Sequence, residues 1–199
     1  MIDGDKAYPS ITTVLGKTRD NTALFEWRKR VGAEKAQQIS TAAATRGTKM
    51  HDLCERFLLN EELGELGYSK GELLFRTILP SLNKLDNVRA LESGLVCHRL
   101  GIAGTVDCVA EVDGVLTVVD FKTSTRPKKE DNIEDYFMQG AFYFNAFHEM
   151  TGEIPKQILI LISVEDGTLQ EFYVKGKDII KYTEMLKERK EAYDFNEAK

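Results

Sequence analysis

Two aspartates and a lysine stand in two strand-like segments, GIAGTVDCVAEV and GVLTVVDFKTS. Asp107 belongs to the first segment, and Asp120 and Lys122 belong to the second. Two carboxylates can hold a divalent cation that polarises a phosphate oxygen and lowers the pKa of bound water. An ammonium group beside them can orient the nucleophile and stabilise the charge that develops on the phosphate. Hydrolysis of a phosphodiester needs this set of groups.

A predicted hairpin turn brings the two segments together. The Asp113-Gly114 dipeptide between them is typical of a two-residue type I′ turn, in which both central residues have positive φ. Such a turn places Val112 opposite Val115 and sets the register of the flanking strands. The same register predicts that Asp107 stands directly opposite Asp120.

Side-chain alternation then gathers the charged groups on one face of the hairpin. In this register Thr105 stands opposite Lys122, and Val118, Asp120 and Lys122 share a face with the residues opposite them. Like charges on opposed residues, with β-carbons roughly 4.5–5.5 Å apart, destabilise a sheet unless something neutralises them. Carboxylate oxygens favour hard cations. The hairpin therefore predicts a Mg²⁺ or Mn²⁺ site.

Each of these three charged residues has a plainer explanation when it is taken alone. Asp120 and Lys122 are then charges at a strand edge, and Asp107 is a surface residue near a turn. Two features favour a site when the residues are taken together. One is the predicted register, and the other is the apolar run VLTVV, typical of a central strand that leaves the core at Asp120.

The elements that must position this site fall into two stretches. Helical patterns dominate before about residue 86 and strand patterns after it, which indicates an N-terminal helical segment (1–86) and a core (87–199) within one compact domain. The fold class is α/β (α+β), with a mixed sheet of about five strands flanked by helices. The predicted helices cover residues 33–44, 46–60, 70–85, 131–150 and 178–193, with two short helices near residues 10 and 22, and the predicted strands cover residues 88–99, 101–112, 114–124, 156–165 and 168–176.

The composition excludes several classes of protein. The 199 residues are 42% hydrophobic and 30% charged, which is a folded globular profile. Because no apolar run approaches the roughly 18–20 residues of a membrane span and no signal-peptide pattern opens the sequence, we expect a cytoplasmic protein without a membrane partner. The net charge of −5 argues against binding nucleic acid through overall charge. The three cysteines form no CxxC pair and are expected to be reduced, buried thiols: Cys54, Cys97 and Cys108.

A series of short motifs resembles the RecB-like branch of the PD-(D/E)XK nuclease superfamily, which includes phage and mitochondrial exonucleases. In chain order the motifs are YPSITTVL with residues 24–27, RGTKMH, ALES, GIAGTVD, VVDFKTS and QGAFY. Each motif alone is weak, since DxK occurs by chance in many proteins. Their order, and their places on the expected elements, make the resemblance specific. It runs through most of the chain and implies a restriction-endonuclease-like core.

The resemblance also implies roles for individual residues. His51, Asp107 and Asp120 would be metal ligands, the carbonyl oxygen of Phe121 would be a further ligand, and Lys122 would position the attacking water. Without the two aspartates, a histidine such as His51 on an apolar helix stripe is more often a core residue or a helix cap.

Three further residues would support this centre by the same resemblance. They are Glu92, Gln139 and Tyr143, and the last two share a helix face because they are four residues apart. One branch of the superfamily carries an iron–sulfur cluster held by four cysteines. With three separated cysteines, we expect no such cluster here.

Substrate contacts are expected from hydroxyl and basic side chains near these motifs. Runs of basic residues are usually solvated surfaces, but two groups lie close to the motifs and can meet phosphates. Trp27 could stack on a base, although its helical spacing with Leu24 and Val31 favours a place in the core. The residues assigned to substrate binding are Ser10, Thr12, Arg46, Lys49, Thr123, Ser124, Arg126 and Lys128.

The resemblance and the predicted site together favour a Mg²⁺- or Mn²⁺-dependent deoxyribonuclease, and specifically an exonuclease. The expected partner is single- or double-stranded DNA with an end, in the cytoplasm of a bacterial or phage-infected cell. Three alternatives stay open: a non-specific or structure-specific endonuclease, a hydrolase of smaller phosphate esters, and a non-catalytic nucleic-acid-binding protein that retains the fold. The last has no evident reason to retain opposed aspartates.

Overall fold

The chain folds around one five-stranded mixed sheet, in a computed structural model that describes residues 2, 3 and 6–198. The strands lie in the order β3-β4-β5-β6-β7, and β5 and β6 are parallel whereas the other neighbours are antiparallel. The predicted mixed sheet is therefore confirmed. Its strands are β3 (Leu85–Cys97), β4 (Ile102–Val112), β5 (Val115–Ser124), β6 (Gln157–Val164) and β7 (Leu169–Lys175), and a small hairpin that the sequence patterns do not predict pairs β1 (Ile2–Asp3) with β2 (Lys6–Ala7).

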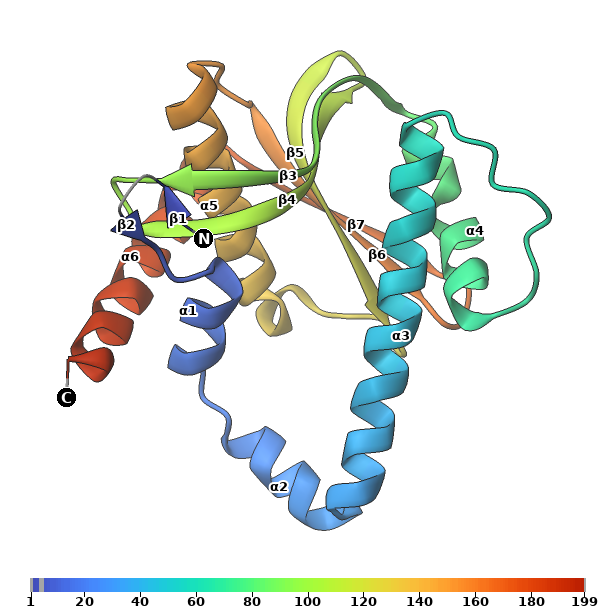
Figure 1. Ribbon diagram of the computed structural model, residues 1–199, viewed down its shortest axis with the longest axis horizontal. Helices are drawn as coiled ribbons and strands as arrows, with labels where there is room; N and C mark the ends of the chain where they lie inside the picture. The colour runs from blue at the N-terminus through green and yellow to red at the C-terminus, as the bar shows by residue number, and fades with distance from the viewer. Residues whose placement is uncertain (1, 4–5, 199) are drawn as a thin grey trace.

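Helices cover both faces of this sheet, which gives the molecule three layers (Figure 1). Apolar side chains of α1, α5 and α6 pack against one face, and those of α3 and α4 pack against the other. This arrangement confirms the predicted α/β class with an N-terminal helical extension. The helices are α1 (Ile11–Thr18), α2 (Thr22–Val31), α3 (Ala33–Leu58), α4 (Lys70–Leu82), α5 (Glu134–Thr151) and α6 (Lys177–Glu197), with a 3₁₀ turn η1 (Glu130–Asn132) before α5.

The N-terminal helices and the sheet share a core. Met50 and Leu53 of α3 and Phe75 of α4 pack in one apolar cluster with Val119 and Phe121 of β5. The change from helix to strand falls at the start of β3, next to the predicted boundary at residue 86. This shared core joins the two stretches in one packed unit. The division into segments 1–86 and 87–199 stays a prediction.

α3 is a single helix of 26 residues, so the prediction of two helices on either side of Thr45 is wrong. Alanines precede that point and have the highest helix propensity, and a single glycine such as Gly47 costs only about 1 kcal/mol in a helix. Gly47 faces β5, where an added β-carbon would lie 3.8 Å from Oγ1 of Thr123. The helix therefore continues unbroken, and its C-terminal half packs on the sheet.

α2 and the first turns of α3 project away from the sheet, at the bottom of the view in Figure 1. None of the ten residues of α2 is buried, although Trp27 is partly covered. Phe25 is 64% exposed and Leu24 is 38% exposed. The prediction that the spacing of Leu24, Trp27 and Val31 marks a core face is therefore wrong, because helical spacing alone does not say whether a partner surface exists.

Two expectations about the cellular environment can be compared with the structure. Cys54, Cys97 and Cys108 are all buried free thiols, as predicted. Burial raises the pKa of Cys97 to about 11, so its thiol stays protonated at neutral pH. Over the described residues, the helices lack the combination of length and apolar character that crossing a bilayer would take.

Candidate active site

β4 and β5 pair over only part of their length, and the candidate site lies where they separate. From the turn, the described register extends to Cys108↔Val119, which confirms the predicted register over that stretch. Beyond this pair, the described hydrogen bond between the two strands comes from the side chain of Asp107 and not from its backbone. Oδ2 of Asp107 accepts a hydrogen bond of 2.7 Å from the backbone N–H of Phe121.

The separation replaces two predicted cross-strand pairs. The described β4–β5 ladder does not reach Asp107 and Asp120, and it does not reach Thr105 and Lys122. On its other edge, β4 continues to pair with β3 here, with Thr105 opposite Gly94. The two aspartates still meet at the site, but through the bond from Asp107 to the backbone of β5 and not as directly opposed residues. Local turn geometry predicts a ladder, whereas packing decides where it opens.

Asp120 is completely buried near the C-terminal end of β5. Neither of its carboxylate oxygens accepts an aligned hydrogen bond from any described residue, although Nζ of Lys122 lies 2.5 Å from Oδ2. Burial lowers the pKa of Lys122, but the charges of Asp120 and Asp107 outweigh burial and leave this pKa raised, so the ammonium stays charged. A buried carboxylate with unfilled acceptor positions is suited to a cation.

His51, Glu92 and Asp107 form a compact group of possible metal ligands. One ligand atom from each lies within 4.8 Å of the others, and Asp120 is outside this group. Nδ1 of His51 is 3.6 Å from Asp107 and 3.9 Å from Glu92. Its Nε2 is 2.9 Å from the carbonyl oxygen of Phe121, which fixes the ring from the other side. Three elements, α3, β3 and β4, thus supply the group.

The backbone of Glu92 is unusual for a strand residue. It has a φ of 43°, in the left-handed region, and it falls between the pairs Leu91↔Cys108 and Ser93↔Val106 of the β3–β4 ladder. Such a conformation costs a non-glycine residue on the order of 1–3 kcal/mol and tends to occur at functional sites. Here it accompanies a carboxylate that faces His51.

The charges of this group shift one another's pKa values. Burial, and then the charge of Asp120, raises the pKa of Asp107 to about 6. Burial lowers the pKa of His51, but the carboxylates of Glu92 and Asp107 outweigh burial and leave it raised. Burying several carboxylates together costs free energy that a bound cation would recover. The electrostatics therefore favour a divalent cation at this position.

Gln139 and Tyr143 face the site from α5, as their spacing predicts. Nε2 of Gln139 donates a hydrogen bond of 3.0 Å to the hydroxyl oxygen of Tyr143. Burial raises the pKa of Tyr143, so the phenol stays protonated and can donate. Both side chains line the same cleft as Asp107 and Lys122.

This cleft has a volume of about 550 Å³ and is lined by eight of the sixteen residues predicted for the site, whereas Asp120 and Phe121 are not among its described lining residues. Ser10 and Thr12 reach it because the N–H of Ala103 donates a 3.0 Å hydrogen bond to the carbonyl oxygen of Pro9, which docks the start of α1 on β4. The hydroxyl of Ser10 also caps α1 by accepting from the N–H of Thr13. The lining residues are Ser10, Ile11, Thr12, His51, Glu92, Ala103, Gly104, Thr105, Asp107, Lys122, Gln139 and Tyr143.

The other six residues predicted to bind substrate are not among the described residues that line this cleft. Nε of Arg46 lies 3.3 Å from Glu165, and Nζ of Lys49 lies 3.6 Å from Asp52. Oγ of Ser124 bonds the carbonyl oxygen of Arg126 in its own loop. Their roles stay predictions, together with those of Thr123, Arg126 and Lys128.

Two residues near the site escape the sequence reasoning. One is Gly104, where an added β-carbon would lie 2.9 Å from Cε1 of Phe142. Because α5 packs so closely on β4 at this point, a larger residue would clash. The ring of Tyr136 lies beside Lys122, with 5.3 Å between Nζ and the ring centroid. A signal for Tyr136 does exist, since it stands three residues before Gln139 and shares its helix face.

Comparisons with known proteins identify a family and several relatives. The family model described as the PD-(D/E)XK nuclease superfamily matches residues 69–198. Mitochondrial genome maintenance exonuclease 1 of Homo sapiens is 29% identical over 178 residues, which covers 80% of this chain and 50% of that protein. The protein of the same name from Xenopus tropicalis is 30% identical over 184 residues, covering 86% of this chain and 52% of that protein. The chain thus spans about half the length of the curated relatives it matches.

Proposed function

Because the chain belongs to the PD-(D/E)XK nuclease superfamily, we propose that it is a metal-dependent deoxyribonuclease that removes nucleotides from a DNA end. One observation carries the proposal most strongly. Asp120 is a fully buried carboxylate without an aligned hydrogen bond from the described residues, and it lies next to Asp107 and Lys122. Its ion pair with Lys122 is to Oδ2, and Oδ1 has no partner among the described residues, whereas buried carboxylate oxygens are normally satisfied.

The donor set fits a divalent cation. Nuclease domains of this superfamily use divalent metals. The predicted ligands here are Asp107, Asp120 and His51; Asp107 and His51 form the compact group with Glu92, and Asp120 lies outside that group. We expect Mg²⁺ or Mn²⁺ because carboxylate oxygens dominate the set. When bound, such a cation supplies a Lewis acid for a phosphate oxygen and for water. The carbonyl oxygen of Phe121, the other predicted ligand, now contacts His51.

The remaining residues of the site would bind and orient the reacting groups. The ammonium of Lys122 lies beside Asp120, where it can hold an attacking water and stabilise negative charge on the phosphate. The hydroxyl of Tyr143 and the amide of Gln139 can donate to phosphate oxygens. The hydroxyls of Ser10 and Thr12 at the start of α1 line the same cleft and can do likewise.

The names of the curated relatives support DNA with an end as the proposed substrate. The curated relatives are named exonucleases of the mitochondrial genome, and half of their length lies outside the part that this chain matches. Activity on an end is therefore a proposal for this chain. The cytoplasm of a bacterial or phage-infected cell also stays a prediction.

Digestion of end-labelled DNA tests the proposed function directly. Linear single- and double-stranded DNA, a closed circle and an RNA of the same sequence are incubated with Mg²⁺ or Mn²⁺, and then with EDTA. We expect stepwise loss from an end of linear DNA, inhibition by EDTA, and recovery when the metal is restored. Cleavage of the circle would instead indicate an endonuclease, and RNA cleavage would broaden the substrate.

Two aspartate variants make this test specific. Asp120→Asn should lower the rate by at least roughly 100-fold, because the charge that holds the cation is lost. Asp113→Asn is the matched control, since Asp113 lies in the exposed β4–β5 turn and asparagine tolerates its φ of 50°. A folded wild-type protein that cleaves no substrate would favour the non-catalytic nucleic-acid-binding alternative.

A further inference from the structure

The ammonium of Lys122 has an aromatic neighbour as well as a carboxylate. Nζ lies 5.3 Å from the centroid of the Tyr136 ring, which is within the range of a cation–π interaction. On its other side Nζ lies 2.5 Å from Oδ2 of Asp120. The Lys122 side chain is only 19% exposed, so little water competes with either partner. Such interactions strengthen when the cation is desolvated.

The position of Tyr136 on α5 ties it to the rest of the site. Tyr136, Gln139 and Tyr143 recur at intervals of three and four residues, which places them along one face of the helix. Gln139 and Tyr143 line the cleft, and Tyr136 extends the same face towards the end of β5. The helix face that lines the cleft therefore also carries Tyr136, the residue that contacts Lys122.

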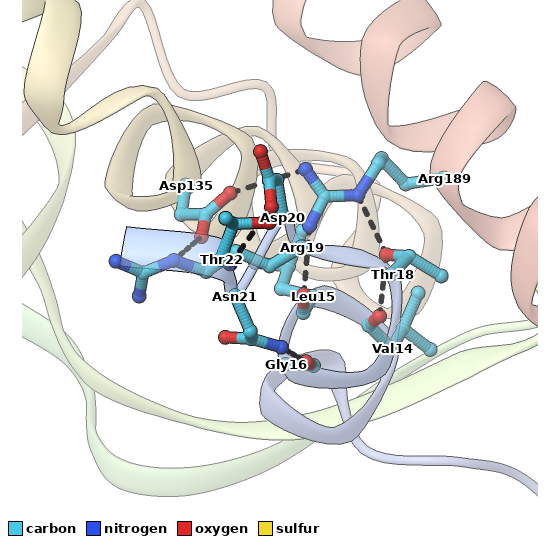
Figure 2. Close-up of polar contacts among 10 residues, drawn as sticks. All are labelled: Val14, Leu15, Gly16, Thr18, Arg19, Asp20, Asn21, Thr22, Asp135 and Arg189. Carbon is cyan, nitrogen blue, oxygen red and sulfur yellow. Dashed lines mark hydrogen bonds and ion pairs between the residues drawn. The ribbon is translucent and has the colours of Figure 1, made fainter. Parts of the chain in front are cut away.

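A polar network fixes the turn of α5 that carries Tyr136 (Figure 2). Asp135, its immediate neighbour, lies 3.4 Å from Nη1 of Arg189 and 3.9 Å from Nε of Arg19. Arg189 also donates to the hydroxyl of Thr18 at 2.6 Å and to the carbonyl oxygen of Leu15 at 2.7 Å, at the end of α1. The start of α5 is thus held by α1 and α6 together.

A hydrogen bond also fixes the backbone of Tyr136 itself. The N–H of Tyr136 donates a 2.9 Å hydrogen bond to the carbonyl oxygen of Ile133, whose side chain is 1% exposed. Phe137, the next residue, is also buried, with 3% of its surface exposed. A ring on a fixed turn can restrict the directions in which a flexible four-carbon lysine side chain points.

We propose that Tyr136 is a positioning residue whose ring face holds the Lys122 ammonium against Asp120. This inference rests on the proposed function, because Lys122 needs a fixed position only if it acts on a phosphate. The hydroxyl of Tyr136 has no part in it. The ring acts through its π face and its bulk, so phenylalanine should replace it and an aliphatic residue should not.

Three variants separate this role from general packing. Tyr136→Phe keeps the ring, and Tyr136→Leu removes it. Tyr182→Leu is the matched control for packing. Tyr182 lies under a different lysine, Lys181, at 4.7 Å, and its ring packs against Phe137 of α5. Its described contacts do not include Lys122. Circular dichroism and urea unfolding establish that each variant folds before kinetics are measured.

Steady-state digestion of DNA gives the first readout. Tyr136→Leu should lower kcat roughly tenfold with KM changed less than about twofold, whereas Tyr136→Phe and Tyr182→Leu should stay close to wild type. An unchanged kcat in folded Tyr136→Leu would overturn the proposal. Equal losses in Tyr136→Leu and Tyr182→Leu would also overturn it, since they would indicate packing alone.

A second readout does not depend on activity. With lysine ε-methylene carbons labelled and the Lys122 signal assigned from Lys122→Arg, the ring current of Tyr136 should shift that NMR signal upfield. The shift should persist in Tyr136→Phe and in Tyr182→Leu, and disappear in Tyr136→Leu. If the wild-type protein digests no DNA, the proposed function fails while this signal still decides whether Tyr136 holds Lys122. A Lys122 signal that is identical in all variants would refute the contact.

Discussion

Asp107 links the two strands of the site and also faces the candidate metal. Its Oδ2 binds the N–H of Phe121, and its Oδ1 lies 3.6 Å from His51. Burial and the charge of Asp120 raise its pKa from 3.8 to about 6. At neutral pH the metal-free protein therefore bears the cost of an ionised carboxylate that the unfolded chain does not bear.

Replacing this charge should stabilise the metal-free protein. Because the folded-state pKa of Asp107 is raised, its contribution to stability is complete below pH 3.8 and is lost as the pH rises through about 6. Asp107→Asn has no charge to bury and can still accept from Phe121. We expect its free energy of unfolding to exceed that of wild type by about 2 kcal/mol at pH 7.5.

Urea unfolding in EDTA at several pH values between 4 and 7.5 measures this difference. Comparing variant with wild type at each pH cancels the titration of most other groups. The difference should grow as the pH rises. A difference that stays constant across the range would show that the raised pKa of Asp107 does not govern stability.

At the scale of secondary-structure elements, the cleft depends on how closely α1 and α5 approach β4. Gly104 marks that contact, since an added β-carbon would lie 2.9 Å from Phe142 of α5 and 3.0 Å from Ile11 of α1. Both neighbours are buried and have little freedom to move. A side chain at this position would push apart the helices that supply Ser10, Gln139 and Tyr143.

Gly104→Ala should therefore destabilise the protein by about 1–3 kcal/mol, as overpacked cores do. Gly16→Ala in α1 is the control, because an added β-carbon there has nothing within 4 Å and alanine favours a helix. Its free energy of unfolding should stay equal or rise slightly. Urea denaturation of both variants measures the effect, and equal stability of the two would contradict the close approach seen at Gly104.

At the scale of the whole molecule, the candidate metal site joins a helix from one face of the sheet to strands of the sheet itself. His51 comes from α3, Glu92 and Asp107 come from β3 and β4, and Asp120, the further predicted ligand, comes from β5. In the folded state these groups converge, and in the unfolded chain they are far apart. A cation that binds them should therefore stabilise the whole fold, because it binds the folded state alone.

Mn²⁺ at about 100 times its dissociation constant should raise the melting temperature by roughly 5–10 °C. Differential scanning calorimetry of the full chain, with EDTA as the reference, measures this shift without any nucleic acid. Asp113→Asn should keep it, and Asp120→Asn should lose most of it. The same shift in Asp120→Asn would exclude Asp120 from the group that holds the cation.

Local patterns in the sequence are enough to predict the strands, most helices and the hairpin that carries Asp107 and Asp120. The Asp113-Gly114 turn sets the register as far as Cys108↔Val119, because turn geometry and side-chain alternation act between neighbouring residues. Together with the motif resemblance, such patterns also identify eight of the twelve described residues that line the cleft, from Ser10 and Thr12 to Gln139 and Tyr143.

Tertiary packing alone decides the rest. It opens the ladder at Asp107, holds Glu92 in the left-handed region, and sets the Tyr136 ring beside Lys122. It also leaves α2 without a buried face, which its apolar spacing does not foretell. Each of these depends on whether residues that are not neighbours in the chain come into contact, and the free energies of such contacts outweigh local preference.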